Sequence, residues 1–123
     1  MIAMPKEIWR SGRDFLIARY VAEHQQLLMR SDKGDGGPTR VEILFGPVSW
    51  MSLSCLTYRN LTLYGLTREE FKAAAGGMDS VEVGGVNYFG IGDGEVQGLI
   101  AAGSFVRDES GKDYWEPSEI LRS

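Results

Sequence analysis

Hydrophobic and polar residues alternate with a period of two over much of this chain, and that period predicts β-strands. Turn-forming residues separate the alternating runs, including Gly46-Pro47 and the tight hairpin signal Gly92-Asp93-Gly94. Gly98 and Gly103 fall inside one run, which predicts bulges or the close approach of a neighbouring strand. The alternating runs cover residues 39–45, 48–53, 61–66, 81–83, 86–91 and 95–106.

Residues 15–31 fit two periods, because their apolar side chains can line one face of a helix or alternate along a strand. We interpret them as strands. The polar loop at residues 32–38 follows them and leads into the alternating run at 39–45, as in a hairpin with a long tip. On this interpretation His24 lies at a strand end or in a turn.

One helix is predicted at about residues 67–76, where Thr67 and Glu70 form a capping-box pattern and Gly76-Gly77 closes the segment. After a polar turn at residues 108–112, Tyr114-Trp115 is predicted to begin a last strand. Pro117 is predicted to open a terminal helical turn that runs through Ile120 and Leu121.

These elements predict a mainly β chain with one short helix, either a single-domain antiparallel β-sandwich or a small, partly open barrel. A length of 123 residues fits one compact domain. We expect residues 1–12 to be a flexible N-terminal segment and residues 13–123 to form the β-rich domain.

Composition limits the kinds of metal, disulfide and redox site that the chain can form, because it contains one histidine, His24, and one cysteine, Cys55. Two-histidine metal sites, four-cysteine zinc sites, disulfides and dithiol pairs are therefore excluded. Cys55 lies in the apolar run Leu53-Ser54-Cys55-Leu56 and is predicted to be buried and inert. No catalytic residue, cofactor or metal ligand is predicted.

Charge and hydropathy exclude two classes of partner. The net charge is −4, the pI is about 5.0, and lysine and arginine do not cluster, so nucleic acid is not expected. No apolar run approaches about 18 residues, so no membrane span is expected. The chain has no secretory signal and a single cysteine, which predicts a cytoplasmic protein.

The candidate partner-binding residues lie mainly near the C-terminus, where aromatic and acidic side chains alternate. Such a segment is typical of an interface anchor with a polar rim, but also of a solvated strand end with Trp115 in the core. Trp9 is added because a tryptophan on a terminal segment docks either on its own domain or on a partner. The set is Trp9, Asp108, Glu109, Asp113, Tyr114, Trp115 and Glu116.

The sequence favours a non-enzymatic protein-interaction module with an unidentified protein partner. In its size, acidity and lack of catalytic motifs, the chain resembles small bacterial β-rich proteins that include toxin-neutralising immunity proteins, which implies a regulatory or neutralising role. An unprotected edge strand could also pair two copies into a homodimer. Two alternatives stay open: a β-barrel that binds a small molecule or lipid, and a small hydrolase that uses His24 or the carboxylates.

Overall fold

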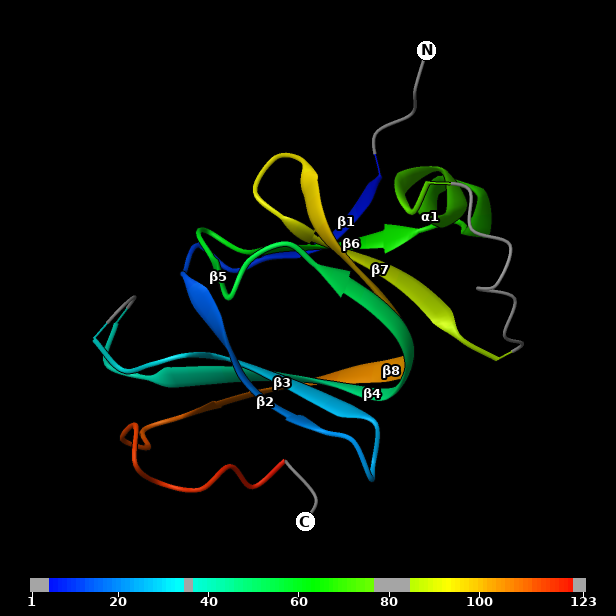
Figure 1. Ribbon diagram of the computed structural model, residues 1–123. Coiled ribbons are helices and arrows are strands. Elements are labelled where there is room, and N and C mark those ends of the chain that lie inside the picture. The colour runs from blue at the N-terminus through cyan, green and yellow to red at the C-terminus, as the bar shows by residue number, and fades with distance from the viewer. Residues whose placement is uncertain (1–4, 35–36, 77–84, 121–123) are drawn as a thin grey trace.

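The structure is a computed structural model that describes residues 5–34, 37–76 and 85–120. Within these residues, eight antiparallel strands form one sheet in the order β1-β6-β7-β8-β4-β3-β2-β5 (Figure 1). The strands are β1 (Lys6–Arg10), β2 (Phe15–Val21), β3 (Gln26–Ser31), β4 (Arg40–Leu53), β5 (Thr57–Tyr58), β6 (Thr62–Leu66), β7 (Asn87–Gly92) and β8 (Val96–Ser110).

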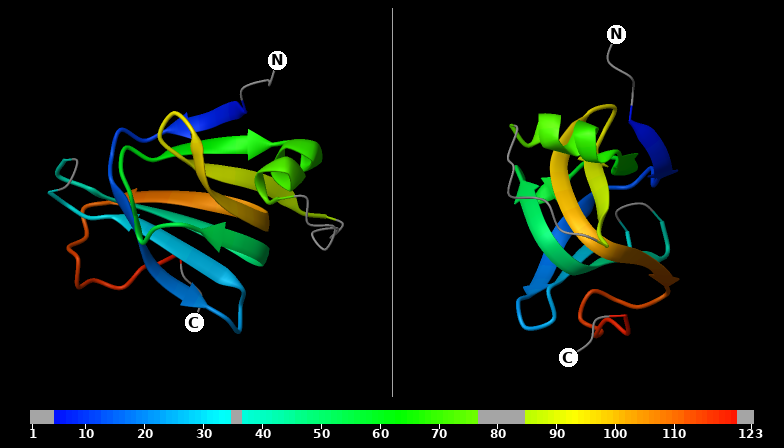
Figure 2. Two further views of the ribbon diagram at one scale, coloured as in Figure 1. Left: turned by 45° about the horizontal axis from the view of Figure 1, so that its top comes forward. Right: turned by 90° about the vertical axis from the view of Figure 1, so that its right-hand side faces the viewer.

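The two longest strands, β4 and β8, bend together and fold the sheet over on itself (Figure 2). The first part of β8 pairs with β7, whereas its last part pairs with the part of β4 that adjoins β3. Gly46-Pro47 and a register shift between Val48 and Trp50 lie at the bend of β4. The sheet is not closed into a barrel, so the mainly β, partly open architecture predicted from the sequence is confirmed.

The core lies on the concave face of this folded sheet. Every second residue of the strands points into it, as the period of two requires. Gly98 lies where a Cβ atom would come within 2.9 Å of Ile91 Cγ1, which confirms the close approach predicted at this glycine. The largest core side chains include Phe15, Phe45, Tyr58, Leu27, Met29, Ile43, Leu63 and Ile91.

The short helix α1 (Arg68–Ala74) covers a second, smaller apolar cluster. Its capping box is formed as predicted, with Thr67 Oγ1 accepting from the Glu70 backbone N–H and the Glu70 carboxylate accepting from the Thr67 N–H. Phe71 is fully buried and packs edge-on against Trp50, at 5.4 Å between ring centroids. Because the helix has only seven residues, this packing rather than helix propensity holds it in place.

The strand interpretation of residues 15–31 is confirmed, since β2 and β3 form an antiparallel pair. Residues 22–25 form the turn between them, and His24 is exposed there. The hairpin predicted across residues 32–38 is also present, with Leu27 paired to Phe45 and Ser31 paired to Val41.

The predictions for the C-terminal region were wrong in three places. Strand β8 extends to Ser110, so Asp108 and Glu109 belong to the sheet and not to a turn. Tyr114 and Trp115 lie in a turn rather than a strand, and residues 117–120 are not helical. The physical reason is that Arg40 of β4 donates hydrogen bonds to backbone carbonyl oxygens of this segment, which are then not available for strand pairing or for a helical turn.

The N-terminal region adds a strand, because residues 6–10 form β1, which pairs with β6. Residues 1–4, like the short run predicted at 81–83, lie outside the described residues. In the part of the chain that is described, no helix is long and apolar enough to cross a membrane.

Candidate functional site

Three charged side chains lie together on the outer face of the sheet, the face of β2, β3 and β4 that is turned away from the core. Arg30 and Glu42 are cross-strand neighbours, with Arg30 Nη2 3.0 Å from Glu42 Oε2. Arg40 Nη2 lies 3.4 Å from the other carboxylate oxygen of Glu42. Arg40 is 0% exposed and Glu42 1% exposed. Such burial requires pairing, because an unpaired charge in the protein interior is strongly unfavourable.

Arg40 also binds the C-terminal strap, the name used here for residues 111–120. Its Nη1 donates to the backbone carbonyl oxygens of Asp113 at 2.9 Å and Glu116 at 2.7 Å, and its Nη2 donates to that of Pro117 at 3.4 Å. Close to the start of the strap, Lys33 Nζ lies 3.3 Å from the Asp113 carboxylate. The strap is thereby held against the outer face, on the side away from β1, β6 and β7 (Figure 1).

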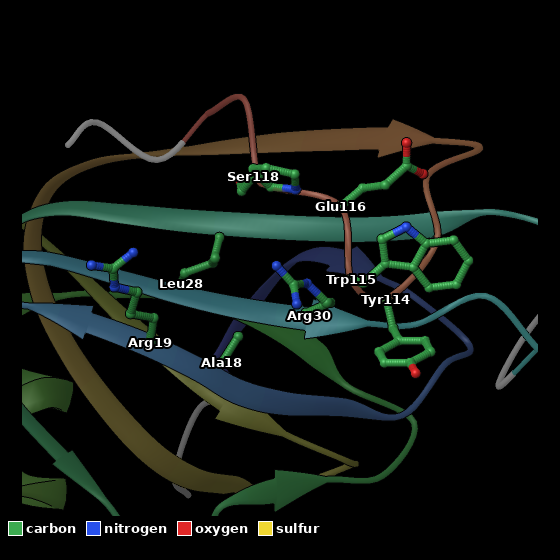
Figure 3. Close-up of a pocket in the computed structure, with 9 residues that line it drawn as sticks. Ala18, Arg19, Leu28, Arg30, Tyr114, Trp115, Glu116 and Ser118 are labelled. Atoms are coloured by element: carbon green, nitrogen blue, oxygen red, sulfur yellow. The ribbon is translucent and has the colours of Figure 1, made fainter.

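A cleft of about 450 Å³ opens between the strap and strands β2 and β3 (Figure 3). Arg19 comes from β2, Arg30 from β3, and the aromatic pair Tyr114 and Trp115 from the strap. In Figure 3 the two rings lie side by side beyond Arg30, and Arg19 is at the opposite end of the cleft. The lining is Ala18, Arg19, Leu28, Arg30, Tyr114, Trp115, Glu116, Pro117 and Ser118.

The aromatic pair is the most exposed apolar surface of the cleft. Tyr114 is 71% exposed and Trp115 67% exposed, and their rings meet edge to face at 5.3 Å between centroids. The alternative that placed Trp115 in the core is therefore wrong. Because Arg40 binds the carbonyl groups on either side of the pair, the backbone that carries both rings is held against the sheet.

The acidic residues predicted to bind a partner are largely engaged within the chain. Glu109 accepts a hydrogen bond from Thr39 Oγ1 at 2.7 Å, and Glu116 accepts one from the Asp113 backbone N–H at 2.6 Å. Asp108 lies on β8 directly opposite Glu42. Of these carboxylates only Glu116 lines the cleft.

Trp9 lies apart from the cleft. It is partly buried against the core, where its ring contacts Phe15 at 6.0 Å between centroids. The guanidinium group of Arg107 lies over the indole ring of Trp9, 4.9 Å from the ring centroid. The structure thus brings Tyr114, Trp115 and Glu116 together and separates Trp9 from them.

The arginines of the site were not among the binding residues predicted from the sequence. Arg30 and Arg40 alternate with core residues along β3 and β4, so their outward direction was readable from the strand period. Arg19 has no side-chain hydrogen bond or ion pair with any other residue that the structure describes. A guanidinium group beside exposed aromatic rings can bind a carboxylate while an apolar side chain packs on the rings.

Cys55 is exposed, so the prediction that it is buried was wrong. Strand β4 ends at Leu53, and the loop that follows carries Cys55 out to the edge of the sheet before β5 begins. Among the described residues, no three histidine, cysteine, aspartate or glutamate side chains are grouped closely enough to hold a metal ion.

Two side chains of β1, away from the cleft, have shifted pKa values. A hydrogen bond from Arg10 Nε to Glu7 Oε1, 2.7 Å long, lowers the pKa of the Glu7 carboxyl group and raises the pKa of Arg10.

Comparison with protein-family models, with curated proteins and with solved structures finds no match to this chain.

Proposed function

We propose that this protein is an interaction module that binds a protein partner in the cleft between the C-terminal strap and strands β2 and β3. The observation that carries the proposal is the exposed pair Tyr114 and Trp115, held at the mouth of a cleft that also contains Arg19 and Arg30. Tryptophan, tyrosine and arginine are the residues most enriched at the energetic centres of protein interfaces. A regulatory or toxin-neutralising role, as in immunity proteins, agrees with such a site.

Attachment of the strap to the sheet supports binding of a defined partner. Arg40 binds the carbonyl groups of Asp113 and Glu116, which flank the aromatic pair, so the backbone that carries both rings is held before a partner arrives. A site that is ordered in advance loses less conformational entropy on binding than a mobile one.

The charge of the cleft suggests a partner that presents a carboxylate rather than a basic surface. Two arginines, Arg19 and Arg30, line the cleft beside one carboxylate, Glu116, which accepts a hydrogen bond from the Asp113 backbone N–H. The net charge of −4 nevertheless repels an acidic protein at long range. Since salt screens charges over about 8 Å at physiological ionic strength, this long-range repulsion is weakened, while a direct contact with Arg19 is retained.

Affinity purification of the tagged protein from its native cell, read by mass spectrometry, tests this proposal. The wild-type chain is compared with Trp115→Ala and with a control, Val106→Ala, which truncates an exposed apolar side chain of β8 outside both cavities. We expect one stoichiometric protein that is lost with Trp115→Ala and retained with Val106→Ala. Recovery of the same protein with both variants, or of none with the wild-type chain, would contradict the proposal.

A second candidate function, binding of a small apolar molecule, rests on a separate cavity. This cavity has a volume of about 390 Å³ and is lined mainly by apolar residues of β1, β6, β7 and β8, including Ile8, Leu66, Tyr88, Phe89 and Phe105. Native mass spectrometry of the protein purified from its native cell distinguishes the two candidates. A bound molecule of constant mass that is lost with Phe105→Trp would favour this second function.

A further inference from the structure

Strand β2 has an open edge over its second half. On the side away from β3, only its first two residues pair with β5, Phe15 with Tyr58 and Leu16 with Thr57. One further hydrogen bond joins the Ile17 N–H to the carbonyl oxygen of Leu56 at 2.8 Å. Among the residues that the structure describes, no strand pairs with this side of residues 18–21, and Figure 1 shows β2 running away from β5 toward the β2–β3 turn.

Exposed apolar side chains gather beside this edge. Leu56 is 77% exposed, although it lies next to β2 in the loop before β5. On β2 itself Tyr20 is exposed within the open stretch, and Leu16 is exposed beside it, in the part that pairs with β5. The cross-strand partners Leu27 and Arg30 place Tyr20 and Leu16 on opposite faces of the sheet. An added strand, whose side chains also alternate between the two faces, can cover apolar side chains on both.

The open edge adjoins the cleft of the proposed function. Ala18 and Arg19, at the start of the open stretch, also line the cleft with Trp115. A strand added beside β2 would lie about 4.8 Å from it, and every second side chain of that strand would point to the outer face, where the cleft is. A segment that pairs with the edge therefore places side chains over the Arg19 end of the cleft, and its continuation across the cleft reaches the aromatic rings at the opposite end.

We infer that the partner, which the proposed function requires, contributes an extended acidic segment that adds to the sheet as a strand alongside residues 18–21. Backbone hydrogen bonds to β2 supply the affinity, as in other cases of strand addition. A carboxylate of the paired stretch binds Arg19, and the part of the segment that continues beyond this stretch across the cleft packs an apolar side chain against Trp115. The segment thus continues the sheet from the point at which β5 stops.

Charge distinguishes this occupant from a second copy of the chain. In a twofold antiparallel pair of β2 strands centred on the open stretch, Arg19 of each copy would lie opposite or diagonal to the same residue of the other. Like charges at such positions are destabilising, whereas opposite charges stabilise the pair.

The test uses the full chain and a library of randomised eight-residue peptides displayed in an unstructured carrier. We expect the selected peptides to be enriched in aspartate and glutamate. Synthetic copies should slow hydrogen exchange of the edge-facing amides of residues 18–21 by about tenfold or more at saturation. Arg19→Glu should weaken their binding by about tenfold or more, whereas Arg19→Lys should weaken it less, because a charge of the same sign remains.

The outcomes separate this inference from the proposed function. Peptides that require Trp115 but leave exchange at residues 18–21 unchanged would overturn strand addition and leave the cleft as the binding site. A selection that yields no binder sensitive to either Trp115→Ala or Arg19→Glu would contradict both. Concentration-dependent dimerisation that protects residues 18–21 in the absence of peptide would contradict the inference, because a second copy of the chain would then occupy the edge in place of an acidic segment.

Discussion

Arg40 is the residue on which the candidate site most depends, and its replacement by methionine should both destabilise the protein and release the strap. The side chain is fully buried and donates to the carbonyl oxygens of Asp113 and Glu116 as well as to Glu42. Methionine fills a similar volume but supplies none of these donors. The substitution removes the hydrogen bonds to the carbonyl oxygens of Asp113 and Glu116 and leaves one oxygen of the buried Glu42 carboxylate without a partner.

The expected loss of stability follows from the contacts. Breaking a buried ion pair by removing one partner costs about 3–5 kcal/mol. Arg30 still binds Glu42 through two nitrogens, at 3.1 and 3.0 Å, so we expect the lower end of that range, about 3 kcal/mol. A domain of this size unfolds with a stability of about 5–15 kcal/mol, so the variant would remain folded but lose a large share of its stability.

Urea unfolding followed by tryptophan fluorescence measures this loss, and hydrogen exchange of residues 112–118 reports on the strap. The control is Arg10→Met, which removes a solvent-exposed arginine of β1 whose partner is Glu7. Arg40→Met should lower the midpoint and speed exchange in the strap. Arg10→Met should lower the midpoint far less, because its ion pair is exposed, and should leave exchange in the strap unchanged. If the two variants unfold at the same urea concentration as the wild-type chain, the buried charges do not hold the strap.

Three further predictions concern a glycine of β8, the cap of helix α1 and the ion pair on β1. Gly98→Val should destabilise the protein by about 1–3 kcal/mol in urea unfolding, because a side chain there overpacks against Ile91; Gly111→Val, with open space around it, is the control. Thr67→Ala should cost about 1 kcal/mol by removing the cap of α1, and thermal unfolding with an unchanged midpoint would refute this. The carboxyl group of Glu7 should titrate by NMR below its ordinary pKa, so its stabilising pair with Arg10 persists above that pKa and is lost as pH falls through the lowered value.

Local patterns in the sequence determined most of the strands and the helix. The period of two in residues 39–45 places Val41, Ile43 and Phe45 in the core and turns Arg40, Glu42 and Leu44 away from it. The capping box at Thr67 sets the start of α1 from four consecutive residues. These features were predictable because they depend on residues that are neighbours in the chain.

Long-range contacts decided the site. Tyr114 and Trp115 have the composition of a strand, but Arg40, 73 residues away from Asp113, binds the carbonyl groups that strand pairing would use. Cys55 has apolar neighbours in sequence, yet it is exposed because β4 ends before it.

The cleft itself combines Arg19, Arg30 and Trp115, which come from three separate segments. Each of these residues could be assigned to a strand or a turn on its own, but no local pattern specifies which of them face one another. Tertiary structure alone decided that β2 has an open edge, because that depends on how many residues β5 contributes to the pair. The sequence determined the elements through local periodicity and capping, whereas the folded sheet decided which surfaces stay exposed, because burial depends on residues far apart in the chain.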